Sequence, residues 1–308
     1  MMLNLPHDPP HFLQVRLGVR RHVRAHLAGV AEVCVGLSGG PDSLALLAGV
    51  LAEGLAATAL IVDHQLQEGS GAVAARAAEQ ARAWGANTRV LPVTVAGEGG
   101  MEAAARRARL EALQAAACGA PVLLGHTLDD QAETFLLAAL RATPGGMLPV
   151  RDCFHRPLLA VRRADTHGAC AELGIQPWHD PQNCDVAYRR VAVRHLLPTL
   201  ADALHADPAP PLAGAATRAA ADAAAVEQWA ASVDPTDVAA LAALPPAVRS
   251  RALARLIRDA GGRVTQNHVA AVDALVMTWH GQGPVDVSGG VRLRRDGGLV
   301  VERASTEQ

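Results

Sequence analysis

Residues 33–44 constrain the fold of this chain more than any other stretch, because they read VCVGLSGGPDSL. An apolar, β-branched run ends there in a turn rich in glycine, serine and aspartate, and an apolar helical pattern begins at Leu44. The order predicts a buried strand, a tight loop and the N-terminus of a helix. Backbone N–H groups, hydroxyls and the helix dipole would converge in such a loop on an anion.

Two other interpretations of this loop can be weighed. A Walker A loop would require a lysine, whereas all 28 Lys+Arg residues of this chain are arginine. An ordinary strand-to-helix loop, in which Asp42 or Ser43 caps the helix, would need no ligand. Ser-Gly-Gly-x-Asp-Ser directly after a strand is more specific than a capping turn, and it favours a phosphate-binding loop.

Composition places the chain among ordered globular proteins. Of its 308 residues, 50% are hydrophobic and 19% are charged, and this length suits two domains. Apolar runs are too short to span a membrane and the N-terminus has no secretory pattern, so we expect a cytoplasmic protein with no membrane partner. The 5 cysteines are scattered without a C-x-x-C pair, which disfavours a zinc or iron–sulfur site.

Strand and helix patterns alternate after the loop. This alternation predicts βαβ units and a doubly wound, mainly parallel α/β sheet that is covered on both faces. Ligands of such sheets bind beyond the carboxyl ends of the strands, so functional residues should directly follow strands. The predicted strands are 32–37, 57–63, 88–95 and 121–125, and the predicted helices are 11–30, 43–53, 70–84, 101–117 and 128–141.

Acidic residues follow two of these strands. Asp63 ends the second strand, where it could bind magnesium or a nucleotide hydroxyl. After the fourth strand, His126 precedes a helix that begins with several acids, among them Asp130 and Glu133. These two acids share a helical face, so both could hold one cationic group. Helix capping is the plainer alternative, although three acids exceed what a cap requires.

Arginines form two groups of interest. Arg106 and Arg109 share a face of the predicted helix 101–117. This face could simply be exposed to solvent, or the two arginines could bind phosphate. A denser cationic group, with the charge that recognition of a polyanion requires, contains Arg189, Arg190 and Arg194. Residues 155–159 are predicted to form a short edge element, since the proline there cannot donate to a ladder.

The composition changes at the proline-rich stretch 207–211, which is the best candidate for a domain boundary. We therefore predict a first domain over 1–205, with its core at about 30–200, and a smaller, mainly helical domain over 212–308. In the second domain, helices are predicted at 212–232, 234–243, 246–260 and 265–280, and glycine-rich turns predict a closing β-hairpin or short meander.

Taken in order, the motifs resemble those of the tRNA(Ile)-lysidine synthetase family, which lies in the N-type ATP pyrophosphatase or PP-loop superfamily. The resemblance spans residues 30–200, its most discriminating part is the acidic helix, and the length resembles that of a short form. The matching motifs are Ser38–Ser43, Asp63-His64, Arg106 with Arg109, His126–Thr134, Arg156–Leu159, Asp180–Asn183 and Tyr188–Arg190.

This resemblance implies an enzyme that modifies the wobble cytidine of an isoleucine tRNA with a CAU anticodon. ATP would adenylate the cytidine C2 oxygen and release pyrophosphate, and the amine of L-lysine would then displace AMP to form lysidine. The implied cofactors are ATP and Mg²⁺, the implied partners are the tRNA and L-lysine, and the resemblance is compatible with a homodimer.

The resemblance also implies a role for each matching residue. The nucleotide would be bound by Ser38, Gly39, Gly40, Pro41, Asp42, Ser43, Asp63 and His126. Catalysis would depend on Asp42, Arg106, Arg109 and Asp130, with Asp42 and Asp63 as Mg²⁺ ligands. Lysine would be bound by Asp130 and Glu133, and tRNA by Arg189, Arg190 and Arg194.

Three departures from the family pattern leave alternatives open. The family usually has arginine at Gln67, tyrosine at Leu110 and glycine at Ala142. A decayed, non-catalytic, ATP-gated RNA-binding module would fit these departures but not the intact acids. A tRNA cytidine thiolase of the same fold would need a C-x-x-C pair. An amidating synthetase would need an ammonia source, and the sequence has no glutaminase-like region.

Overall fold

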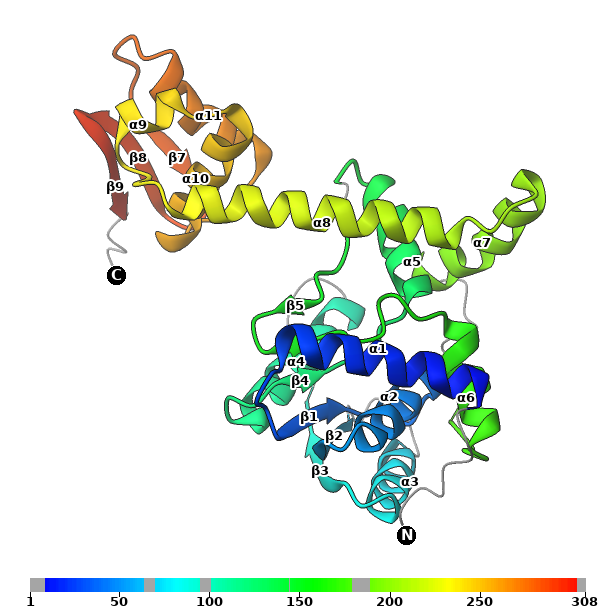
Figure 1. The fold of residues 1–308 in the computed structure, drawn as a ribbon. Coiled ribbons are helices and arrows are strands. Elements are labelled where there is room, and N and C mark those ends of the chain that lie inside the picture. Colours follow the sequence, from blue (N-terminus) through cyan, green and yellow to red (C-terminus); the bar gives the residue numbers. More distant parts are fainter. Residues whose placement is uncertain (1–8, 64–69, 95–100, 144, 179–188, 304–308) are drawn as a thin grey trace. The chain divides into compact units, whose positions relative to one another are not determined.

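The computed structural model describes residues 9–63, 70–94, 101–143, 145–178 and 189–303, and a six-stranded sheet lies at the centre of the first part (Figure 1). Its strands are β1 (Glu32–Gly36), β2 (Ala56–Asp63), β3 (Asn87–Pro92), β4 (Val122–Leu123), β5 (Val150–Arg151) and β6 (Phe154–His155). They lie in the order β3-β2-β1-β4-β6-β5, and only the β5–β6 pair is antiparallel within this sheet. The predicted doubly wound, mainly parallel sheet is confirmed, with its switch point between β1 and β4.

Helices cover both faces of this sheet. In β1, Val33 and Val35 pack on the face that carries α1, α2, α3 and α6, whereas Cys34 between them packs on the face of α4. The alternation follows from the period of two in a strand, and it buries the sheet on both sides. The helices of this part are α1 (Pro10–His26), α2 (Pro41–Ala52), α3 (Ser70–Ala83), α4 (Met101–Ala117), α5 (Leu128–Ala139), α6 (Arg163–Glu172) and α7 (Arg189–Leu204).

Two features differ from the sequence-based predictions. Helix α6 was not predicted, because its polar sequence has little apolar periodicity. The predicted edge element at 155–159 is also wrong, since β6 lies inside the sheet between β4 and β5. Pro157 follows β6 rather than lying within it, so its missing N–H removes no ladder hydrogen bond.

The chain divides into two compact units, Met1–Ala219 and Ala220–Gln308. The division falls inside α8 (Ala209–Ala231), C-terminal to the proline-rich stretch at which the boundary was predicted. The first turn of α8 belongs to the first unit because Ala209 packs with Ala132 of α5 and Leu197 of α7. Prolines are tolerated in the first turn of a helix, so they mark a helix start here.

In its described part, the second unit combines the C-terminal half of α8 and three further helices with a small antiparallel sheet. The order of its strands is β7-β8-β9, which confirms the predicted closing meander. One apolar core, which includes Leu241, Leu253 and Leu293, joins the helices to the sheet. The elements are α9 (Val238–Ala243), α10 (Pro246–Asp259), α11 (Gln266–Met277), β7 (Val285–Val287), β8 (Val291–Asp296) and β9 (Gly298–Arg303).

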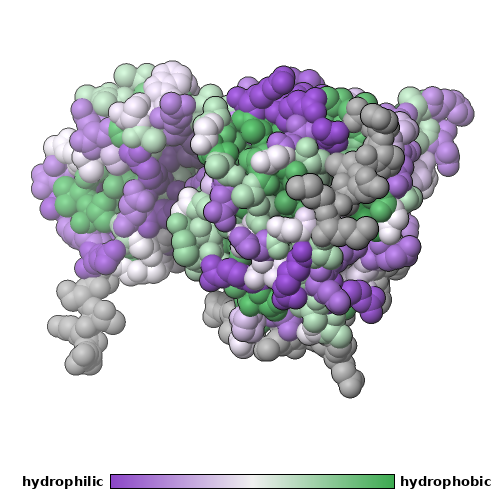
Figure 2. Space-filling model, turned by 60° about the horizontal axis from the view of Figure 1, so that its bottom comes forward, coloured by the Kyte–Doolittle hydropathy of each residue, from purple (hydrophilic) through white to green (hydrophobic). Residues whose placement is uncertain are grey.

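Within the described ranges, no helix has the length and apolar character needed to cross a membrane. Figure 2 shows hydrophilic residues interspersed with hydrophobic ones over the face in view.

A pair of buried histidines connects α1 with β6. The Nε2 atom of His22 lies 2.9 Å from Nδ1 of His155, and the ring of His26 packs 4.7 Å from that of His22. Burial, together with the neighbouring His155 and His26, lowers the pKa of His22 to about 4. Both rings of the hydrogen-bonded pair are therefore neutral at pH 7, with one ring donating and the other accepting.

We expect acid to destabilise the fold through His22. In the unfolded chain His22 takes up a proton near pH 6.5, whereas the folded ring resists protonation until about pH 4. The free energy of unfolding should therefore fall by about 2–3 kcal/mol as the pH drops through that window. Urea unfolding at a series of pH values measures this, and H22Q should flatten the profile whereas H195Q, at an exposed histidine, should not. An unchanged slope in H22Q would contradict the assignment.

Candidate active site

The loop between β1 and α2 is held by its own serines. Ser43 Oγ donates to Gly40 O at 3.0 Å and accepts from Ser38 N at 3.2 Å, while Gly40 N donates to Ser38 Oγ at 3.3 Å. Gly39 has φ +81°, a left-handed conformation that a residue with a side chain adopts only with strain. These contacts preorganise the turn before any ligand arrives.

Helix α2 begins at this loop without a side-chain cap. Its N-cap residue is Gly40 and its first residue is Pro41, so the capping alternative considered from the sequence is wrong. Among the described residues, no side chain caps the first N–H groups of α2, and the positive end of the helix points at the loop. This is the geometry in which helix N-termini bind phosphate groups.

Asp42, in the first turn of α2, faces α6. Thr166 Oγ1 donates a short hydrogen bond to Asp42 Oδ1, and Thr166 itself is fully buried. Burial raises the pKa of Asp42 to about 6, although the hydrogen bond from Thr166 opposes that rise. Sequence reasoning missed Thr166; the available signal was its i,i+3 spacing from Arg163, which places both on one face of a helix.

The segment after β4 lies directly against this loop. A Cβ atom built on Gly125 would lie 2.9 Å from the carbonyl oxygen of Asp42 and 3.1 Å from the backbone nitrogen of Ser43. Real Cβ contacts of that length essentially do not occur, so only glycine allows this approach. The carboxyl ends of β1 and β4 therefore meet at the switch point, as the topology predicted.

Helix α5 opens with a capping box formed by Thr127 and Asp130. Asp130 Oδ2 accepts hydrogen bonds from Thr127 N at 2.7 Å and Thr127 Oγ1 at 2.8 Å, and Thr127 Oγ1 accepts from Asp130 N at 3.4 Å. The arrangement fixes both the start of the helix and the orientation of the Asp130 carboxylate.

Three arginines converge on the two acids of α5. We refer to Asp130, Glu133, Arg163, Arg190 and Arg194 as the Arg–carboxylate cluster. Both Arg163 from α6 and Arg190 from α7 bridge the two carboxylates, each reaching Asp130 Oδ1 at 2.9 Å. Arg194, one turn further along α7, reaches Glu133 with Nε at 2.9 Å and Nη2 at 3.4 Å.

Both carboxylates of the Arg–carboxylate cluster are saturated. The fully buried Glu133 accepts four hydrogen bonds, from Arg163, Arg190 and twice from Arg194. Asp130 also accepts four, two from arginines and two from Thr127. An ionised carboxylate has about four acceptor positions, so none is left for a further cation.

The charges of this cluster do not cancel, since three guanidinium groups face two carboxylates. Burial disfavours the charged form of Asp130, but Arg190 and Arg163 outweigh it and hold the pKa of Asp130 well below its usual range. For the same reason the carboxylates hold the pKa of Arg163 and Arg190 above the ordinary value. Asp130, Arg163 and Arg190 therefore stay ionised across the physiological range.

Asp129 has a separate role beside the Arg–carboxylate cluster. It accepts hydrogen bonds from Arg162 Nη2 at 3.1 Å and from the backbone nitrogen of Arg163 at 2.7 Å. Arg162 also pairs with Asp207, immediately before α8. Asp129 thus connects α5 to the start of α6, which places Arg163 opposite Asp130 and Glu133.

His126, which follows β4, and Arg109 of α4 are half-buried residues, and each has one polar side-chain atom that is fully buried. Neither His126 Nδ1 nor Arg109 Nε has a hydrogen-bond partner in the part of the chain that the structure describes. Burial lowers the pKa of His126 to about 3, with Arg190, Arg156 and Arg109 adding to the effect against Asp130. Burial and neighbouring Arg106 and Arg190 lower the pKa of Arg109 to about 10.

The remaining predicted positions are more peripheral. Asp63 ends β2, the neighbour of β1, and is half-buried, whereas Arg106 on α4 and Arg189 at the start of α7 are exposed. Positions outside the described residues are His64, Gln67, Asp180, Asn183 and Tyr188. Of the other two departures from the family pattern, Leu110 packs beside the α4 core and Ala142 has φ +55°, the conformation that glycine would adopt without strain.

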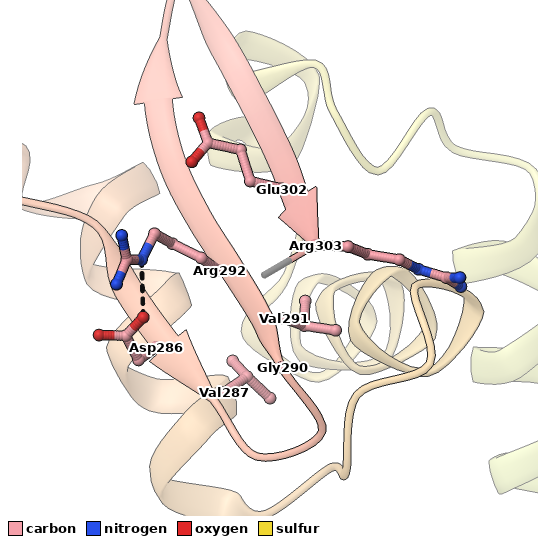
Figure 3. A pocket seen from close by; sticks show the side chains of 7 residues that line it. All are labelled: Asp286, Val287, Gly290, Val291, Arg292, Glu302 and Arg303. Atoms are coloured by element: carbon pink, nitrogen blue, oxygen red, sulfur yellow. Dashed lines mark hydrogen bonds and ion pairs between the residues drawn. The ribbon is translucent and has the colours of Figure 1, made fainter. Parts of the chain in front are cut away.

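The second unit has a pocket of about 290 Å³ against its small sheet (Figure 3). Its polar lining comes from Asp286, Arg292, Glu302 and Arg303, and Arg292 Nε donates to Asp286 Oδ1 at 2.7 Å. Two acids and two arginines balance one another there. The pocket therefore lacks the excess of positive charge seen around His126.

The fold and this site define a class of protein. A loop of Ser-Gly-Gly-x-Asp-Ser between β1 and an uncapped α2, at the switch point of a mainly parallel sheet, is the site of a PP-loop ATP-utilising enzyme. The PP-loop domain family matches residues 18–200, and the TilS substrate-binding domain family matches residues 237–300.

Relatives of similar sequence show to which family within the PP-loop class the chain belongs. The chain is 46% identical to a tRNA(Ile)-lysidine synthase of Corynebacterium glutamicum, over 92% of this chain and 91% of that protein. It is 48% identical to a tRNA(Ile)-lysidine synthase of Corynebacterium efficiens, over 95% and 93%. The chain belongs to the tRNA(Ile)-lysidine synthase family.

Among solved structures, the U34-tRNA thiolase NcsA from Methanococcus maripaludis resembles this chain with a TM-score of 0.54 and 18% identity, over 68% of this chain and 77% of that one. At that identity the likeness extends to the fold alone. The four described cysteines, Cys34, Cys118, Cys153 and Cys170, are free thiols scattered over the first unit.

Proposed function

We propose that this chain ligates L-lysine to C2 of the wobble cytidine of a CAU-anticodon isoleucine tRNA and converts ATP to AMP and pyrophosphate. The proposal rests on the observation that this member of the family has both parts of an adenylation and ligation site. An uncapped phosphate loop lies beside a buried pair of acids that holds cations. The substrate is a tRNA, so we expect the reaction to take place in the cytoplasm.

In the first step the cytidine C2 oxygen attacks the α-phosphorus of ATP, and pyrophosphate leaves with the electrons of the broken P–O bond. The loop residues Ser38, Gly39, Gly40 and Ser43 would receive the pyrophosphate with N–H and O–H donors that are already oriented. Donors fixed in advance stabilise charge as it develops, because they need no rearrangement during the reaction. Arg109 would stabilise the same phosphate charge from the α4 side.

Mg²⁺ is the expected companion of the nucleotide. Among the described residues, no group of three or more His, Cys, Asp or Glu side chains is placed to hold a metal. A nucleotide-bound Mg²⁺ needs only one or two carboxylates beside phosphate and water, and Asp42 and Asp63, which follow the adjacent strands β1 and β2, fit that demand. When bound, the metal would neutralise phosphate charge.

In the second step lysine gives up a proton to a carboxylate or to water, its neutral amine attacks C2, and AMP leaves with the C2 oxygen and the electrons of the broken C–O bond. Because Asp130 and Glu133 are saturated, we propose that the lysine ammonium binds by replacing a guanidinium rather than by filling an empty site. Arg194 is the best candidate for release, since its side chain is 32% exposed, against 18% for Arg163 and 27% for Arg190. The released guanidinium would then contact a tRNA phosphate, as expected for a residue of the α7 cationic group.

The direct test is incorporation of radiolabelled lysine into an unmodified isoleucine tRNA transcript. We expect incorporation that requires ATP, releases AMP and pyrophosphate, and is absent from a transcript with uridine at the wobble position. Binding of ATP and tRNA without lysine incorporation would refute the ligase and support a non-catalytic module.

If lysine replaces Arg194 at Glu133, removal of Arg194 should have opposite effects on the binding of lysine and of tRNA. In R194Q two acceptor positions on Glu133 lose their guanidinium, so the KM for lysine should fall while tRNA binds about tenfold more weakly. R21Q is the control, because Arg21 is an exposed arginine of α1 to which no role in binding lysine or tRNA is assigned. Kinetics with lysine as the varied substrate and filter binding of tRNA measure the two effects. A higher KM for lysine in R194Q would show that Arg194 helps to hold lysine and does not compete with it.

A further inference from the structure

Arg156 lies on the carboxyl edge of the sheet, beside the site but outside the residues assigned to it so far. It directly follows β6, which pairs in parallel with β4 through Leu123 and His155. Leu124 N donates to His155 O at 2.8 Å, so Arg156 and the Gly125-His126 segment leave the sheet side by side. The positions of β4 and β6 thus place Arg156 next to His126.

The Arg156 side chain is buried and forms no ion pair with any residue that the structure describes. It is 8% exposed, its Nη1 atom donates to Leu148 O at 3.0 Å, and its Nε atom has no hydrogen-bond partner among the described residues. By contrast, Arg163 and Arg190 of the Arg–carboxylate cluster, which are less buried, both reach carboxylates. A buried, unpaired guanidinium is costly, which indicates a missing acceptor of negative charge.

The same acceptor is missing for two neighbours. Arg109 Nε and His126 Nδ1 are also buried and unpartnered in the described part of the chain. Positive charges outnumber negative ones near these groups. Burial and Arg106 lower the pKa of both Arg109 and Arg156 to about 10, and His126 has Arg190, Arg156 and Arg109 near it against Asp130 alone. Three groups with an unpartnered polar atom, on α4 and on the segments that follow β4 and β6, therefore lie where arginines outnumber the neighbouring acids.

We propose that Arg156, with Arg109 and the neutral ring of His126, binds a phosphate oxyanion of the substrates. Guanidinium groups match phosphate geometry, and a phosphate would supply both the charge and the acceptor atoms that the pocket lacks. Two sources carry this chemistry, the α-phosphate of the nucleotide and the tRNA phosphodiester next to the target cytidine. The identity of these substrates rests on the proposed function, but the presence of a phosphate site does not.

The experiment compares R156Q and R156K with R151Q, which removes the same charge from an exposed neighbour on β5. Two binding arms are measured without turnover: α,β-methylene-ATP by calorimetry without tRNA, and the isoleucine tRNA transcript by filter binding at several salt concentrations. We expect R156Q to lose about tenfold in affinity in one arm, with R156K intermediate and R151Q near wild type. If the bound phosphate belongs to tRNA, the slope of log affinity for tRNA against log salt concentration should also fall in magnitude by about one.

A third measurement separates binding from structure. Because R156Q removes an unpaired buried charge, its ligand-free melting temperature should equal or exceed that of R151Q. A marked fall in that temperature would give Arg156 a structural role, and wild-type affinity in both arms would leave no phosphate bound to it; either result overturns the proposal. Failure of lysine incorporation by the wild-type protein would instead refute the proposed function, without changing these binding results.

Discussion

Replacing Glu133 by alanine is expected to lower the free energy of unfolding by about 3–5 kcal/mol and to abolish lysine transfer. Glu133 is fully buried and accepts hydrogen bonds from Arg163, Arg190 and Arg194. Without it, Asp130 alone would face three guanidinium groups from two helices, α6 and α7. Their mutual repulsion should separate α7 from α5, so the loss combines an uncompensated buried charge with misplaced functional groups.

Chemical unfolding and the lysine incorporation assay measure this prediction together. E227A is the control, because Glu227 pairs with Arg251 on the surface, with side chains 56% and 43% exposed. Such exposed pairs contribute at most about 1 kcal/mol. E133Q adds a second comparison, since it keeps the shape of the side chain but removes the charge and replaces one acceptor oxygen by an amide donor. An E133A protein as stable as E227A would show that the Arg–carboxylate cluster does not stabilise the fold.

Replacing Gly125 by alanine is expected to lower the turnover of ATP-dependent adenylation by about 100-fold or more. The added methyl group would meet the backbone of Asp42 and Ser43, which has no flexible end that could move aside. Relief of the contact must shift the phosphate loop relative to the carboxyl end of β4. A displacement of about 1 Å suffices for such a loss, because adenylation requires in-line alignment of the attacking oxygen and the departing pyrophosphate.

Pyrophosphate release in the presence of tRNA is the readout for G125A. The control is G283A, at a glycine whose added Cβ would meet no atom within 4 Å. Circular dichroism and the melting temperature distinguish a shifted loop from a lost fold. Wild-type turnover in a folded G125A protein would mean that the close approach of the two segments is not required for adenylation.

Much of the fold follows from local patterns. Apolar runs of strand length, glycine-rich turns and helical periodicity predicted β1 to β4 and helices α2 to α5 close to their observed bounds. The position of the phosphate loop followed from the same patterns, because Gly39 and Gly40 matter for backbone geometry that neighbouring residues alone impose. Helix α6 escaped prediction, since it is polar and its role is to present Arg163 and Thr166 to distant partners.

The chemistry of the acidic helix shows the limit of local patterns. Asp130 and Glu133 were expected to offer free carboxylates to a cation, but their partners come from positions 30 to 61 residues further along the chain. Arg190 and Arg194 were expected to face tRNA, yet both guanidiniums turn inward to Glu133. Binding of lysine by the two acids and of tRNA by the two arginines therefore stays a prediction. The R194Q experiment tests it for Glu133 and Arg194.

By itself the sequence determined the strand–loop–helix unit at residues 33–44, the mainly parallel sheet and the family, because each depends on spacing between near neighbours. Only the tertiary structure decided which charges meet. Core packing sets the positions of α5, α6 and α7, and those positions saturate Asp130 and Glu133, whereas the Nε atoms of Arg109 and Arg156 have no acceptor in the described part of the chain. Charge pairing depends on distance in space, which spacing along the chain does not encode.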